Sequence, residues 1–117
     1  MIDVTIKLLS RSADQDQFYI VQTDRVQVGE DPIIVAPEVA AEFVGRDLML
    51  EITSNGGPIR FQIRGKNLAT WPNRPTTIEF HPGRRISFAP VGMTPPDPDQ
   101  APAQVEALAE QVEVVSG

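Results

Sequence analysis

The chain has 117 residues, a formal net charge of −6 and no cysteine. The length fits one domain of about 90 residues with an appendage, and the lack of cysteine excludes disulfides, thiolate metal sites and a cysteine nucleophile. Eleven prolines and eight glycines indicate many turns, and therefore short strands rather than long helices.

The first ten residues, MIDVTIKLLS, contain an acidic residue and only a short apolar run, which does not fit a signal peptide. No apolar run reaches the roughly 20 residues that a membrane-spanning helix needs. We therefore expect no membrane partner, and a location in the virion if the source is viral and otherwise in the cytoplasm. The acidic net charge argues against nucleic acid as a partner.

The first third of the chain alternates apolar and polar residues, which is typical of half-buried strands. Residues 2–9 predict a first strand, and residues 18–22 predict a second strand antiparallel to it. A turn at 23–24 would lead into a third strand at 25–28. The continuously apolar run at 32–36 predicts a short buried strand.

The middle of the chain predicts one short helix and a hairpin. Residues 37–44 begin with a proline and precede a glycine, so they predict a helix of at most two turns. Residues 48–53 and 58–64 alternate as strands on either side of Asn55-Gly56-Gly57, a strong turn signal. We expect these two strands to pair with each other.

Residues 76–91, TTIEFHPGRRISFAPV, contain two alternating runs on either side of Pro82-Gly83 and predict a second hairpin. A three-residue loop at 82–84 would place all four apolar side chains on one face of this hairpin. The expected pairs are Phe80 with Ile86 and Ile78 with Phe88.

Residues 1–91 together predict a single all-β domain, an antiparallel β-sandwich or small barrel of seven or eight short strands with one short helix. From Gly92 the composition changes, and the stretch GMTPPDPDQAPA carries four prolines. We expect this stretch to be an extended linker that neither joins a sheet nor packs against a core. Residues 92–117 would then form a proline-rich C-terminal arm.

The last part of this arm, residues 103–115, places four apolar residues at heptad spacing with glutamates between them. The four are Val105, Leu108, Val112 and Val115. One interpretation is a short amphipathic segment that needs a partner surface, because so short a free helix would fray. The other is a disordered acidic tail.

Trp71 is the only tryptophan and lies in the irregular stretch 68–74. Either it plugs an open end of the sandwich, or it is an exposed contact for a partner protein or a sugar ring.

No residue pattern in the chain indicates catalysis. Glu79 and His81 lie two apart on a predicted strand and so share a face, but two ligands are too few for a metal site. His81 is the only histidine, and no serine lies in a nucleophile motif. We expect a protein that is not an enzyme and has no cofactor.

Charge is segregated along the chain. Residues 60–85 contain six basic residues and one acidic residue, whereas the rest of the chain contains four basic and fifteen acidic residues. The basic residues are Arg60, Arg64, Lys66, Arg74, Arg84 and Arg85. They indicate either an ordinary solvated face with cross-strand ion pairs or a docking patch for an acidic surface, for example the acidic tail of a neighbouring copy.

The leading functional hypothesis is a non-enzymatic structural or accessory protein of a large assembly, such as a phage capsid decoration protein or minor virion protein. Its partners would be protein subunits of that assembly, for example a capsid shell, and copies of itself. The expected interaction residues are Arg60, Arg64, Lys66, Arg84, Arg85, Trp71, Val105, Leu108, Val112 and Val115. Two alternatives are a carbohydrate- or ligand-binding module using Trp71 and Tyr19, and an enzyme using Glu79 and His81.

Overall fold

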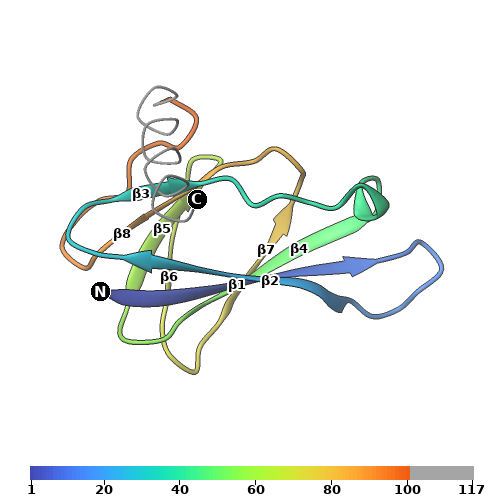
Figure 1. The fold of residues 1–117 in the computed structure, drawn as a ribbon, viewed down its shortest axis with the longest axis horizontal. Helices are drawn as coiled ribbons and strands as arrows, with labels where there is room; N and C mark the ends of the chain where they lie inside the picture. Colours follow the sequence, from blue (N-terminus) through green and yellow to red (C-terminus); the bar gives the residue numbers. More distant parts are fainter. Residues whose placement is uncertain (101–117) are drawn as a thin grey trace, which may run out of the picture.

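The computed structural model describes residues 1–100 as a β-sandwich of two four-stranded antiparallel sheets (Figure 1). The first sheet has the order β2 (Tyr19–Val28), β1 (Ile2–Arg11), β4 (Asp47–Ser54), β7 (Thr76–Phe80). The second has the order β3 (Ile33–Val35), β8 (Ile86–Ala89), β5 (Ile59–Ile63), β6 (Lys66–Thr70). The predicted all-β fold is confirmed, and the two separate sheets make it a sandwich rather than a barrel.

The first sheet buries every second residue of its two central strands. In β1 the buried apolar residues are Val4, Ile6 and Leu8, and β1 pairs with β4 so that Ile6 lies opposite Ile52 and Leu8 opposite Leu50. Because successive side chains of a strand point to opposite faces, this alternation directs one apolar face into the core and leaves the other to solvent.

The second sheet supplies an aromatic pair to the core. Phe61 of β5 and Phe88 of β8 lie directly opposite each other, both are fully buried, and their ring centroids are 5.9 Å apart with the planes tilted by 39°. Aromatic pairs in such offset geometry stabilise a fold beyond the area that they bury.

A buried polar contact ties the two sheets together. The Thr70 hydroxyl, on β6, donates a hydrogen bond of 2.7 Å to the carbonyl oxygen of Ile52 on β4, and Thr70 is fully buried. Ser10 of β1 is also buried, but its hydroxyl is the one buried side-chain oxygen or nitrogen atom without a hydrogen-bond partner among residues 1–100.

Neither of the two predicted hairpins forms. β4 pairs with β1 and β7, and β5 pairs with β6 and β8, so the turns after β4 and after β7 carry the chain from one sheet to the other. Phe80 therefore lies opposite Leu48, and Phe88 opposite Phe61 and Ile33. Both predictions were wrong because alternation identifies the buried face of a strand but not the strand beside it.

Three local predictions also differ from the structure. The predicted turn at 23–24 lies inside β2, where Thr23 and Asp24 pair with β1; an edge strand tolerates polar residues because one side of it faces solvent. The predicted helix at 37–44 is reduced to a 3₁₀ turn, Ala41–Phe43, without a side-chain cap. Part of the stretch predicted to be irregular forms β6.

The connection between β5 and β6 explains why the sequence did not predict β6. Arg64 and Gly65 form a two-residue loop in which both residues have positive φ, 52° and 76°. Such a loop matches the twist of paired strands and permits a tight hairpin, but it usually contains Asn or Asp rather than Arg at its first position.

The proline-rich segment after β8 packs against the sandwich, contrary to the sequence-based expectation. Pro95 and Pro98 are buried, and the carbonyl oxygens of Pro95 and Pro96 accept hydrogen bonds from the second sheet. The predicted heptad segment, residues 103–115, lies outside the described residues.

Candidate functional site

Five of the predicted interaction residues belong to the second sheet or its connections: Arg60, Arg64, Lys66, Arg84 and Arg85, called the second-sheet cations below. Arg60 is exposed on β5 and lies between Ala69 and Ala89 of the neighbouring strands. Arg64 is in the β5–β6 loop and Lys66 begins β6, and both are exposed. Arg84 and Arg85 precede β8 and are half-buried.

The strand register places three of these cations at one end of the sheet. Gln62 and Ser87 are paired in the antiparallel β5–β8 ladder. Arg64 lies two residues after Gln62 and Arg85 two residues before Ser87, so both extend beyond the pair in the same direction. Arg84 adjoins them in the chain.

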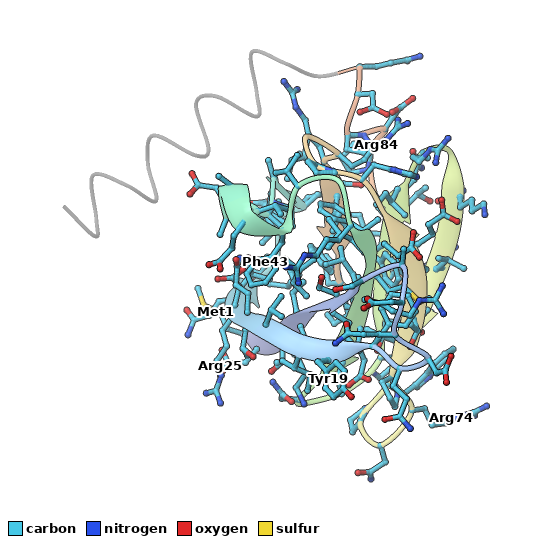
Figure 2. The ribbon with its side chains drawn as sticks, turned by 90° about the vertical axis from the view of Figure 1, so that its right-hand side faces the viewer. Met1, Tyr19, Arg25, Phe43, Arg74 and Arg84 are labelled. Carbon is cyan, nitrogen blue, oxygen red and sulfur yellow. The ribbon has the colours of Figure 1, made fainter. Side chains whose placement is uncertain are left out.

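Arg74, the remaining basic residue of the 60–85 stretch, lies elsewhere. Figure 2 shows Arg84 at the top of the molecule and Arg74 at the bottom. The basic residues of this stretch therefore do not form one continuous patch: Arg74 and its neighbour Trp71 are separate from the end of the sheet that carries Arg84.

The second-sheet cations have no ion pair within residues 1–100. The ion pairs found there are Lys7–Glu51 at 4.0 Å, Arg11–Asp47 at 3.0 Å and, when His81 is protonated, His81–Glu79 at 2.8 Å. All three join residues of the first sheet, or of the connection that follows β7. The neighbours of Arg60 in the ladder are alanines, which offer its guanidinium no side-chain acceptor. Within the described chain, these five basic side chains are therefore unpaired.

Trp71 does not plug the sandwich, because it is 41% exposed. The Arg74 guanidinium lies 5.5 Å from the centre of its ring, and the Arg74 N–H donates to the Trp71 carbonyl oxygen at 3.2 Å. A cation over an indole ring is an attractive contact and covers one face of that ring. Tyr19 is also exposed, but it begins β2 of the first sheet, whereas Trp71 lies in the connection between β6 and β7. The two aromatic residues of the carbohydrate hypothesis therefore come from different elements.

Glu79 and His81 line an open groove of about 650 Å³ at one end of the first sheet. Arg11 and Asp47 line the same groove, and the Arg11 guanidinium also lies 4.6 Å from the centre of the Phe18 ring. The sequence did not reveal the ion pair between Arg11 and Asp47 because the two residues are 36 positions apart. In this groove Arg11 is paired with Asp47 and Glu79 contacts His81, whereas Arg46 makes no ion pair within residues 1–100. No group of three or more His, Asp or Glu residues within residues 1–100 is arranged to hold a metal ion.

No family model, curated protein or solved structure matches this chain. Within the described part of the chain, no helix has the length and apolar character needed to cross a bilayer. The candidate site therefore rests on its own geometry, and the strongest feature of that geometry is that the second-sheet cations make no ion pair within residues 1–100.

Proposed function

We propose that this chain is a non-enzymatic structural or accessory subunit of a larger protein assembly, for example a decoration protein on a phage capsid, and that it docks through the second-sheet cations. The observation that supports this proposal is that all five cations lack an ion pair within residues 1–100, although acidic residues outnumber basic ones in the whole chain.

The charge layout gives the docking an orientation. An acidic body with one basic region is attracted to an acidic surface by that region and repelled elsewhere, which favours a single approach. Four of the five cations are arginines, whose planar guanidinium binds a carboxylate through two parallel hydrogen bonds. Because these charges are at the surface, the attraction weakens as salt is added.

The C-terminal arm would add a second contact. Residues 101–117 contain three glutamates and no basic residue, and they include Val105, Leu108, Val112 and Val115. Once the sandwich has docked, a tethered second contact forms at high effective concentration and slows dissociation. Docking by the sandwich alone would therefore be weaker than docking by the whole chain.

Site-specific photo-cross-linking in the native source tests this function. A photoreactive amino acid at position 60 should cross-link the chain to one protein, whereas the same amino acid at position 27, exposed on β2 of the opposite sheet, should not. Cross-links of equal yield and identity from both positions, or none from position 60, would contradict docking through the second sheet.

The exposure of Trp71 supports a second candidate function, binding of a carbohydrate or another flat ligand. One face of its ring is free of the Arg74 guanidinium, and an exposed indole stacks on the apolar face of a sugar ring.

A further inference from the structure

The outer face of the second sheet carries one row of residues that crosses all four strands. Ile34 of β3 lies opposite Ser87 of β8, Ser87 opposite Gln62 of β5, and Gln62 opposite Asn67 of β6. We call this row the track. Three of its members are buried although they point away from the core: Ile34 is 4% exposed, Ser87 0% and Gln62 9%.

Gln62 and Ser87 are covered by the proline-rich segment 95–98, which we call the strap. The Gln62 side-chain amide donates to the Pro95 carbonyl oxygen at 3.3 Å and to Asn67 Oδ1 at 3.1 Å. The Ser87 hydroxyl donates to the Pro96 carbonyl oxygen. Pro95 and Pro98 are buried, so the strap is held by both polar and apolar contacts.

The chemistry of the track matches that of a proline-rich chain. Proline has no N–H and presents only its carbonyl oxygen for hydrogen bonding, and the track presents side-chain donors, an amide and a hydroxyl, to two such oxygens. A proline-rich segment is also extended before it binds, so little conformational entropy is lost on docking.

A short turn connects the strap to its own sheet. After β8 ends at Ala89, the Met93 N–H donates to the Pro90 carbonyl oxygen at 3.1 Å, and Gly92 has a positive φ of 90°. Val91, at the tip of this turn, is 62% exposed. Straightening the turn would release the strap without breaking any strand pairing, because the strap belongs to no strand.

We propose that the track is a binding site for an extended proline-rich segment, and that in the assembly it binds the strap of a second copy of this chain. An exchanged strap makes the same contacts as a strap bound within its own chain. Protein concentration and the geometry of the 90–93 turn therefore set the equilibrium between the monomer and the strap-exchanged complex. The proposal concerns contacts between copies and does not depend on the acidic partner of the proposed function.

A complementation experiment with two full-length variants tests this exchange. The strap variant carries Pro95→Asp and Pro98→Asp and keeps an intact track. The track variant carries Gln62→Glu and Ser87→Asp, whose carboxylates repel the strap carbonyls, and keeps an intact strap. Each alone should be a monomer of 12.8 kDa by native mass spectrometry, and mixing should give a heterodimer of twice that mass.

The matched control carries Pro72→Asp and Pro75→Asp, two exposed prolines of the β6–β7 connection. It retains its own strap on its track and should form much less heterodimer with the track variant. Two folded variants that stay monomeric when mixed would overturn the proposal.

A peptide measurement keeps the test decisive if the track variant does not fold. A synthetic peptide of residues 91–100 should bind saturably to the strap variant, and the same peptide with aspartate at positions 95 and 98 should not. Absence of binding by the first peptide would overturn the proposal, as would equal binding by both.

Discussion

The side-chain amide of Gln62 donates a hydrogen bond to the carbonyl oxygen of Pro95, 33 positions later in the chain and 3.3 Å away. The bond joins the middle of the second sheet to a segment whose composition is typical of a linker. One outer face of the sandwich is therefore partly covered by the chain itself, and the exposed Arg60 lies in the neighbouring row of that face.

Replacing Gln62 by alanine should lower the free energy of unfolding by about 1–3 kcal/mol. The substitution leaves the carbonyl oxygen of the buried Pro95 without its donor, and an unsatisfied buried polar group is costly. Urea denaturation followed by circular dichroism measures the loss. The matched control is Gln27→Ala on exposed β2, which should change stability by no more than about 0.5 kcal/mol; equal effects of the two changes would refute this role of Gln62.

Removal of the two buried hydroxyls should affect the free energy of unfolding differently. Ser10→Ala removes a hydroxyl that has no partner, so stability should stay the same or rise by up to about 1 kcal/mol. Thr70→Val removes the donor to the Ile52 carbonyl oxygen between the sheets and should lower stability by about 1–3 kcal/mol. Thermal and urea unfolding of both variants check this, and a marked loss in Ser10→Ala would show that its hydroxyl does have a partner.

The aromatic pair in the core should show energetic coupling. Phe61 and Phe88 are opposite each other with their centroids 5.9 Å apart, so a double-mutant cycle of Phe61→Leu and Phe88→Leu should give a coupling energy of about 0.5–1.5 kcal/mol. Additive effects would contradict the observed pairing of β5 with β8.

The fluorescence of Trp71 should be that of an exposed side chain. Trp71 is the only tryptophan, and at 41% exposure its emission should be that of a solvated indole and be readily quenched by acrylamide. Trp71→Phe should change stability by no more than about 0.5 kcal/mol. Glycans that shift the emission would favour the carbohydrate-binding function, and a broad glycan panel without effect would argue against it.

The sequence predicts which face of each strand is buried better than it predicts which strands pair with each other. Alternation correctly placed Phe80, Ile86 and Phe88 in the core. It paired the wrong strands, because a turn that crosses to the other sheet and a turn that closes a hairpin both preserve an inward apolar face. Which one forms depends on contacts between residues far apart in the chain, such as the opposition of Phe61 and Phe88.

The candidate site was predictable only as a set of charges. Counting residues between Arg60 and Arg85 revealed the excess of positive charge, but not that Arg74 lies away from Arg84 (Figure 2). The strap was missed because proline-rich composition predicts an extended conformation and does not say what the extended chain packs against. Its donors, Gln62 and Ser87, looked like ordinary outward-facing residues.

The mass of the native complex tests the central claim most directly. We expect the chain, isolated from its source at low salt, to elute with a much larger protein assembly, and to be released from it progressively as salt screens the second-sheet cations. Charge reversal by Arg60→Glu and Arg64→Glu should release it at lower salt than the exposed control Arg25→Glu on β2. Recovery of the unmodified chain only as a free 12.8 kDa monomer at low salt would contradict the account.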